Sequence, residues 1–125
     1  MTTSLMLQEA LSASECVALQ LSQDQDRYAA LGRTLRSTSF HSAVTVARGS
    51  SDHASNYLAY LIMARMGRLV TSLPMSLITL YKSPLVTRDT LAVSISQSGQ
   101  SPDVVEPITY FRNGGATTVA LPLRK

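Results

Sequence analysis

The sequence predicts an α/β protein with a parallel sheet, and two observations lead to that prediction. Short runs rich in β-branched residues alternate with segments of helical periodicity along the 125-residue chain. The run over residues 91–95 is almost continuously apolar, which is typical of a strand covered by helices on both faces. Parallel strands need a crossover between them, and the intervening helical segments are long enough to supply one.

The first forty residues are expected to form helices that precede the sheet. Five apolar residues recur at spacings of three, four and seven and so form one helical stripe: Val17, Leu21, Tyr28, Leu31 and Leu35. A separate, shorter helix is expected over residues 4–11, and the polar residues 37–39 interrupt the pattern. Cys16 is expected on an apolar helix face as a buried structural thiol, because no neighbouring histidine or basic cluster would activate it.

Four strands and three further helices are expected after residue 40. The strands are predicted over residues 43–47, 68–72, 90–96 and 116–121. Helical spacing returns over residues 54–66, and residues 75–81 are compatible with one or two helical turns. A last helix is predicted over residues 101–112, with Pro107 inside it. Because proline lacks an N–H and crowds the preceding turn, a bend or break is expected between Asp103 and Pro107.

Composition and charge exclude several classes of function. The net charge is +3 and the basic residues are scattered, so a nucleic-acid-binding surface is not expected. The single cysteine rules out an internal disulfide framework and a cysteine-based zinc site, and it suggests a reducing, cytoplasmic location. The most apolar stretch, residues 69–81, is too short to span a membrane. His41 is expected in a loop. His53, one turn into a helix, is expected to pack, with contact to a substrate as the alternative. Two distant histidines do not suggest a metal site.

Two turns share one construction, in which a strand ends, glycine and serine follow, and a helix begins. The first is at residues 49–51 and the second at residues 96–101. In a parallel sheet both lie at the carboxyl ends of strands, where open α/β sheets bind ligands. Free N–H groups at a helix start, together with the helix dipole, attract a phosphoryl group. Gly99 permits close approach of the backbone, and Pro102 suits the first helical position after an N-cap at Ser101.

A simpler interpretation of the second turn is that residues 96–101 only cap the following helix. Phosphate-binding turns occur in many unrelated folds, so this spacing alone does not identify a fold family. The turn does not match a Walker loop, and no dinucleotide-binding glycine pattern follows a predicted strand. It also lacks the pattern of a serine-hydrolase nucleophile elbow. No metal or organic cofactor is expected.

The two turns resemble those of sugar isomerase (SIS) domains, in which a loop of pattern S-x-S-G-x-[ST]-x-[DE] holds phosphate. Residues 95–103 match this loop, and residues 47–54 are similar to the first phosphate turn of the same family. Met6 and Glu9 are similar to the M-x-x-E-I segment that opens these proteins. The resemblance is greatest to the isomerase half of glucosamine-6-phosphate synthase and to stand-alone relatives with two SIS domains, including deaminases of glucosamine 6-phosphate.

The resemblance implies a three-layer, flavodoxin-like parallel sheet and a set of site residues. Phosphate contacts are implied for six side chains: Ser50, Ser51, Ser96, Gln97, Ser98 and Ser101. Gly49 and Gly99 are implied as supporting backbone positions. The implied ligand is a phosphorylated or amino sugar such as fructose 6-phosphate or glucosamine 6-phosphate.

The resemblance also implies that residues 1–40 form a helical segment and that residues 41–125 form a first SIS domain truncated after its fourth strand. In the synthase-like relatives, the glutamate, histidine and lysine that open the sugar ring lie later in the chain. Three carboxylates near the turns are expected to stabilise helix starts rather than to catalyse: Asp52, Asp103 and Glu106. No catalytic residue is therefore expected in this chain, and full-length relatives are expected to be homodimers.

Three functions remain open. The chain is the phosphate-binding part of an isomerase, aminotransferase or deaminase of amino-sugar phosphates, or a module that senses a sugar phosphate without chemistry, or an inactive fragment. Regulators of the second kind carry a helix-turn-helix domain, for which the first forty residues offer no basic recognition helix. The family favours the first function, and the 125 residues taken alone favour binding without turnover.

Overall fold

The structure is a computed structural model that describes residues 4–122. The chain divides into two compact units, Met1–Thr38 and Ser39–Lys125. Two segments were expected from the sequence, residues 1–40 and 41–125. Their outer ends, residues 1–3 and 123–125, lie outside the described residues. Each unit is taken by itself below.

The first unit is one long helix, α1 (Leu5–Ser37), rather than the two helices predicted. Ser4 caps it, because the Ser4 Oγ accepts a hydrogen bond from the Leu7 amide at 3.3 Å. The polar residues after position 11 do not interrupt the helix; the Ser12 hydroxyl donates to the Glu9 carbonyl one turn earlier at 3.1 Å. Serine side chains that bond back to the helix backbone are tolerated there, which the apolar spacing alone did not indicate.

The apolar residues of α1 are more exposed than the sequence predicted. Cys16 is exposed, so the prediction of a buried thiol is wrong. Val17 and Leu21 are 55% and 58% exposed. Helical spacing predicts that such side chains share a face, but burial depends on what covers that face, and spacing carries no information about the cover. No helix within residues 4–122 combines the length and apolarity needed to cross a membrane.

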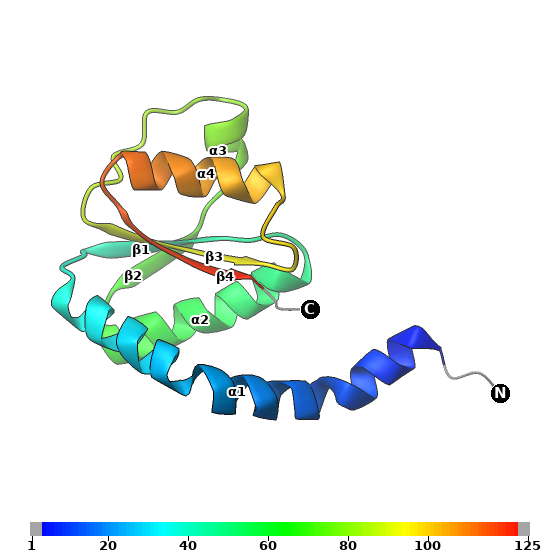
Figure 1. The fold of residues 1–125 in the computed structure, drawn as a ribbon. Helices are drawn as coiled ribbons and strands as arrows, with labels where there is room; N and C mark the ends of the chain where they lie inside the picture. The colour runs from blue at the N-terminus through cyan, green and yellow to red at the C-terminus, as the bar shows by residue number, and fades with distance from the viewer. Residues whose placement is uncertain (1–3, 123–125) are drawn as a thin grey trace. The chain divides into compact units, whose positions relative to one another are not determined.

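The second unit alternates strands and helices, as predicted (Figure 1). Its elements are, in chain order, β1 (Ser42–Val46), α2 (Ser50–Met66), β2 (Leu69–Ser72), α3 (Ser76–Thr79), β3 (Thr90–Ser96), α4 (Pro102–Asn113) and β4 (Thr117–Pro122). All adjacent strands pair in parallel, in the order β2-β1-β3-β4. The predicted α/β fold with a flavodoxin-like parallel sheet is therefore confirmed.

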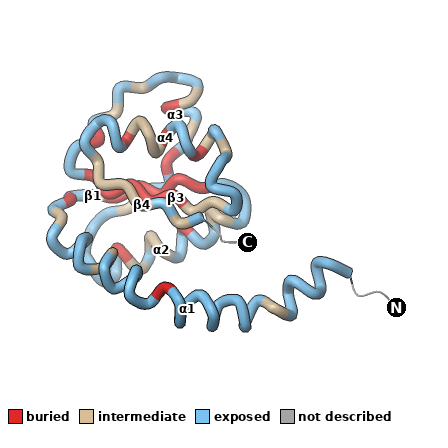
Figure 2. The backbone as a smooth tube through the Cα atoms, viewed as in Figure 1, coloured by how far each residue is buried: buried red, intermediate tan, exposed pale blue. Residues whose placement is uncertain are grey.

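The sheet lies between two helical layers (Figure 1). α2 covers one face, and α4 with the short α3 covers the other. Burial is concentrated on the central strands β1 and β3, which carry most of the buried tube in Figure 2. The main core cluster joins the sheet to the α3 and α4 layer and consists of Val44, Val46, Leu73, Ile78, Ala92, Val104 and Phe111. A rigid, double-covered sheet of this kind fixes where the turns at its edge begin.

A bend or break was predicted between Asp103 and Pro107, and the break is wrong, because Pro107 lies inside a continuous α4. α4 runs continuously from Pro102 to Asn113, and Figure 1 draws it as one ribbon. The ring of Pro107 is less than 2% exposed. Its missing N–H leaves the Asp103 carbonyl without its helical donor, and burial of the apolar ring offsets that loss. The break was predicted from the local cost alone, whereas the burial depends on tertiary packing.

Candidate functional site

The two serine turns leave the same edge of the sheet because the strands before them are neighbours. β1 pairs in parallel with β3, with Val46 opposite Ser94, so both turns begin at the carboxyl ends of adjacent strands. β1 has β2 on its other side and β3 has β4, so the strand order reverses between them. In open α/β sheets, ligands bind in the crevice outside the strand ends at this reversal point.

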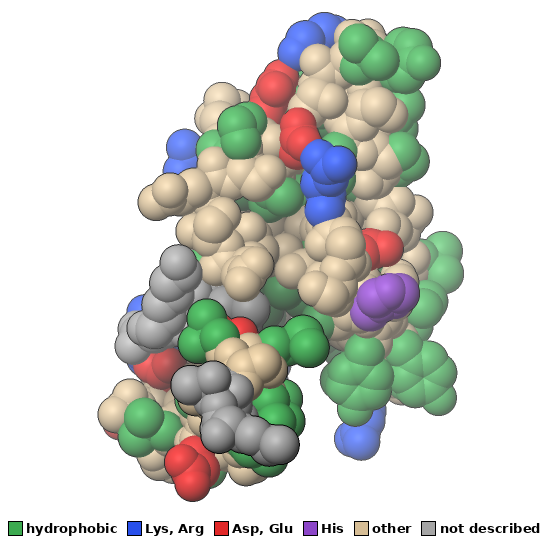
Figure 3. Space-filling view, turned by 90° about the vertical axis from the view of Figure 1, so that its right-hand side faces the viewer, with side chains coloured by type: hydrophobic (Ala, Val, Ile, Leu, Met, Phe, Trp, Pro, Cys, Tyr) green, Lys and Arg blue, Asp and Glu red, His purple; other side chains and the backbone are tan. Residues whose placement is uncertain are grey.

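A cavity of about 410 Å³ lies at this edge, and residues from both turns line it. Its lining consists of Arg48, Gly49, Ser50, Ser51, Ile95, Ser96, Gln97, Ser98, Ser101 and Val104. All six side chains that the sequence suggested as phosphate contacts are thus brought around one cavity, together with Gly49. Figure 3 looks onto this side of the molecule, where uncharged polar side chains and backbone, drawn in tan, occupy the centre of the surface.

The first turn connects β1 to α2 and is short. Gly49 occupies the N-cap position of α2 with φ 60° and ψ −133°, a conformation that residues with a Cβ rarely adopt. The Asp52 amide donates to the Gly49 carbonyl at 3.0 Å, which starts the helix. No side chain caps the start of α2, so its first amides are not occupied by a side-chain acceptor.

The second turn connects β3 to α4 and is held by its own serines. The Gly99 amide donates to Ser96 Oγ at 3.1 Å, and the Gln100 amide donates to Ser98 Oγ at 3.2 Å. Gly99 is in the left-handed region with φ 68°. Each serine hydroxyl that accepts an amide still has its own proton to donate. Ser96 and Ser98 can therefore shape the loop and present donors to a ligand at the same time.

The start of α4 follows the prediction for Ser101 and Pro102. Ser101 is the N-cap, Pro102 is the first helical residue, and the Val104 amide donates to the Ser101 carbonyl at 3.0 Å. The Ser101 side chain makes no capping hydrogen bond. Ser101 lines the cavity, and its hydroxyl, which does not cap the helix, is available to a ligand.

Arg48 is the cavity residue that the sequence reasoning missed. It carries the only charge among the lining residues, all of which belong to the described part of the chain. Its guanidinium forms an ion pair with the carboxylate of Asp103 in the first turn of α4. The sequence could have indicated Arg48 as a site residue, because it lies between the end of a predicted strand and Gly49, in the first turn.

The carboxylates near the turns have side-chain partners. Asp52 accepts a hydrogen bond from Ser72 Oγ at 3.3 Å, and Glu106 pairs with Lys82 at 2.7 Å. None of the three acidic residues considered from the sequence lines the cavity. Among residues 4–122, no group of three or more His, Cys, Asp or Glu side chains is placed to hold a metal ion.

Neither histidine is among the residues that line the cavity. His41 precedes β1 in a loop, as predicted, and its amide donates to the Asp89 carbonyl at 2.8 Å. His53 is in the first turns of α2 but is exposed, so the prediction that it packs is wrong. The helical position was right, and the side chain is on the solvent-facing side of the helix.

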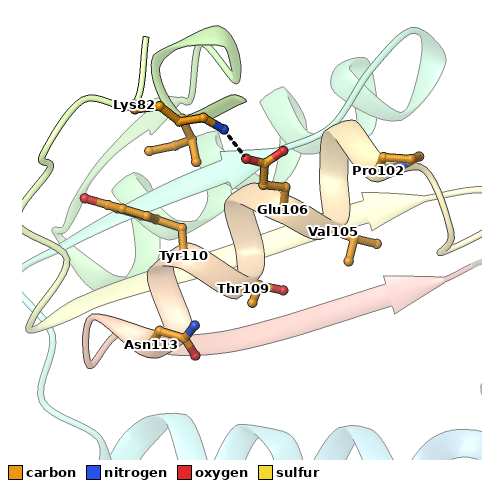
Figure 4. A pocket seen from close by; sticks show the side chains of 8 residues that line it. Lys82, Pro102, Val105, Glu106, Thr109, Tyr110 and Asn113 are labelled. Carbon is orange, nitrogen blue, oxygen red and sulfur yellow. Dashed lines mark hydrogen bonds and ion pairs between the residues drawn. The ribbon is translucent and has the colours of Figure 1, made fainter. Parts of the chain in front are cut away.

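Two other cavities border α4. The larger, of about 450 Å³, lies along the outer face of α4, where Lys82 reaches over to Glu106 (Figure 4). Val105, Thr109 and other side chains of the helix line it, but none of the predicted site residues does. Gly99 instead lines a smaller cavity, of about 260 Å³, between α4 and β4. The serine turns therefore line the 410 Å³ cavity and not the larger one along α4.

Fold and cavity together define a class of protein, namely an α/β domain with flavodoxin-like strand order and a polar crevice at its reversal point. A family model described as the SIS domain matches residues 38–123, which is more than half of the chain. The chain therefore belongs to the SIS domain family, and the resemblance drawn from the two turns is confirmed.

Individual relatives agree with this assignment. The glutamine–fructose-6-phosphate aminotransferase (isomerizing) of Tropheryma whipplei is 35% identical over 78 residues, which are 62% of this chain and 12% of that protein. A solved structure assigned as a phosphosugar isomerase, from Silicibacter pomeroyi DSS-3, is 41% identical with a TM-score of 0.74 and covers 86% of this chain and 33% of its own. The chain thus spans a third or less of the length of these relatives.

A third relative supports the fold alone. The C-terminal domain of glucosamine-fructose-6-phosphate aminotransferase from Francisella tularensis has a TM-score of 0.58 at 24% identity. It covers 68% of this chain and 24% of that chain. The parallel sheet and its helical layers are therefore retained at low sequence identity.

Proposed function

We propose that this chain binds the phosphoryl group of a phosphorylated or amino sugar, such as fructose 6-phosphate or glucosamine 6-phosphate, in the crevice between the two serine turns. The observation that carries the proposal is the convergence of both turns on one cavity at the reversal point of the sheet. A serine turn at a helix start is explained by helix capping when a serine side chain caps the helix. No side chain caps the start of α2 or of α4, so helix capping does not account for the serines of either turn.

The donors at this cavity suit a phosphoryl group. α2 and α4 both begin at its border, and neither start is capped by a side chain. Their free amides and helix dipoles favour an anion. We assign direct contacts to six side chains: Ser50, Ser51, Ser96, Gln97, Ser98 and Ser101. Gly49 and Gly99 support the turns by allowing the backbone to follow them.

The relatives named above support a sugar phosphate over other phosphorylated ligands. The Tropheryma protein bears the name of a fructose-6-phosphate aminotransferase, and the Silicibacter structure that of a phosphosugar isomerase. We therefore propose that the chain supplies the phosphate-binding part of an isomerase, aminotransferase or deaminase of amino-sugar phosphates.

For these 125 residues we propose binding without turnover. Sugar isomerisation needs a base beside the carbon next to the carbonyl, within hydrogen-bond reach of its proton. The cavity lining contains no carboxylate, histidine or lysine. Its serines, its glutamine and its paired arginine can hold and orient a phosphoryl group but do not supply that base.

The test is a titration of the chain with glucosamine 6-phosphate and with fructose 6-phosphate, followed by thermal unfolding and calorimetry. A ligand that binds only the folded state at a hundred times its Kd stabilises that state by about 2.7 kcal/mol, so the melting temperature should rise clearly. Glucosamine and fructose without the phosphoryl group are the matched controls and should give no rise. Absence of a shift at millimolar sugar phosphate would contradict the proposal and favour an inactive fragment.

A further inference from the structure

Arg48 and Asp103 form an ion pair at the border of the phosphate cavity. Arg48 follows β1 and lines the cavity, and Asp103 is in the first turn of α4, 55 residues further along the chain. The two side chains are 62% and 47% exposed. Exposed ion pairs contribute little to stability, so the guanidinium is not fixed to this partner by a large free energy.

The residues around the cavity do not supply the positive charge that would balance the proposed ligand. A phosphate monoester carries close to two negative charges at neutral pH. Apart from Arg48, every lining residue is neutral. The charge of Arg48 is in turn neutralised by Asp103, whose carboxylate is beside the same helix start that attracts the ligand. A dianion entering the cavity therefore competes with Asp103 for Arg48 and for the start of α4.

We infer that Arg48 is a phosphoryl-binding residue and that Asp103 is its resident counter-ion, which the ligand displaces. The inference rests on the proposed function and adds to it the residue that selects the charge of the ligand. A guanidinium can bond two phosphoryl oxygens at once with parallel N–H groups, which a single exposed carboxylate contact does not exploit fully. Displacement of Asp103 makes the cavity favour a doubly charged phosphoryl group over a neutral sugar.

A different role for the same pair would be a permanent strap between the two turns. In that case Arg48 and Asp103 would stay paired when the ligand binds, and loss of either side chain would loosen the cavity. The two roles make opposite predictions for Asp103. Removing a competing carboxylate strengthens ligand binding, whereas removing one half of a strap weakens it.

The chain offers a matched control on the same helix. Lys82 and Glu106 also form an ion pair between a loop and α4, with side chains 66% and 48% exposed. This pair borders the cavity of about 450 Å³ along α4, shown in Figure 4. No residue of the two serine turns lines that cavity. A Lys82→Gln variant therefore loses the same kind of interaction at similar exposure without touching the proposed phosphate site.

The experiment measures the Kd of glucosamine 6-phosphate for the full 125-residue chain by calorimetry at fixed ionic strength. Arg48→Gln should weaken binding by about tenfold or more, the loss expected for a charge-assisted hydrogen bond. Arg48→Lys should recover part of that loss, because it retains the charge but not the bidentate geometry. Asp103→Asn should strengthen binding by about two- to fivefold. Lys82→Gln should leave the Kd within about twofold.

The outcomes separate this inference from the proposed function. If the natural chain binds and Arg48→Gln binds equally well, the inference is overturned and the proposed function stands. Weaker binding by Asp103→Asn overturns it in favour of the strap. If the natural chain binds no sugar phosphate, the inference and the proposed function are both contradicted. Circular dichroism checks each variant, and if Arg48→Gln does not fold, the sign of the Asp103→Asn effect decides between the two roles.

Discussion

Different interactions hold the conformations of the two turns that border the cavity. The β1–α2 turn is short, and its path depends on the unusual conformation of Gly49. The β3–α4 turn is longer, and Ser96 and Ser98 hold it through hydrogen bonds to backbone amides within the turn. One turn is shaped by backbone freedom and the other by side-chain acceptors.

This difference bears on what each serine does. In the longer turn, Ser96 and Ser98 have both a structural hydrogen bond and a place in the cavity lining. In the shorter turn, Ser50 and Ser51 line the cavity at a helix start that no side chain caps. Substitution of a serine in the shorter turn should therefore change ligand binding but not stability. Substitution of Ser96 or Ser98 in the longer turn should change both.

The largest effect is expected for Gly49→Ala. The added Cβ meets no atom within 4 Å, so the cost comes from the backbone conformation and not from a clash. A non-glycine residue held in such a conformation costs about 1–3 kcal/mol, which should appear as a lower free energy of unfolding in urea. Gly32→Ala in α1, also with open space around the new Cβ, is the control. It should stabilise the chain by about 0.5–1 kcal/mol, because alanine favours a helix interior.

A smaller loss is expected for Gly99→Ala in the longer turn. Gly99 has φ 68°, and its added Cβ would approach the Cβ of Pro122 at 3.4 Å, an ordinary contact. The left-handed conformation should cost about 1–2 kcal/mol in the free energy of unfolding. Gly99→Asn should cost less, since asparagine tolerates this region better. Equal losses for alanine and asparagine would mean that backbone conformation does not control this turn.

Ser96→Ala should lower stability and ligand binding together. Loss of the acceptor for the Gly99 amide should reduce the free energy of unfolding by about 0.5–1.5 kcal/mol. The Kd for glucosamine 6-phosphate should rise as well, because the hydroxyl is also a proposed donor. Denaturation and calorimetry on the same preparation check both. An affinity loss with unchanged stability would show that the Ser96 hydrogen bond does not hold the loop.

Ser51→Ala should change stability least. No side-chain cap holds the turn at Ser51, so the free energy of unfolding should stay within about 0.5 kcal/mol of the natural chain. The Kd for glucosamine 6-phosphate should nevertheless rise by about two- to tenfold, as for one neutral hydrogen bond. A stability loss as large as that of Ser96→Ala would remove the proposed distinction between the two turns.

Local features were predictable where neighbours in the sequence decide them. The bounds of β3 were predicted without error, because residues 90–96 are a β-rich run directly followed by turn residues. The start of α4 also followed from Ser101 and Pro102, whose preferences act within one helical turn. Features that depend on packing were missed: the exposure of Cys16, and the burial that keeps Pro107 in a continuous helix.

By itself, the sequence determined the succession of strands and helices and the two serine turns that carry the donors. Backbone propensity and turn chemistry act over a few residues, so they can be read along the chain. Only the tertiary structure decided the strand order β2-β1-β3-β4, which makes β1 and β3 neighbours and brings the turns to one cavity. It also decided the contact between Arg48 and Asp103, since residues 55 positions apart meet only when the sheet between them is complete.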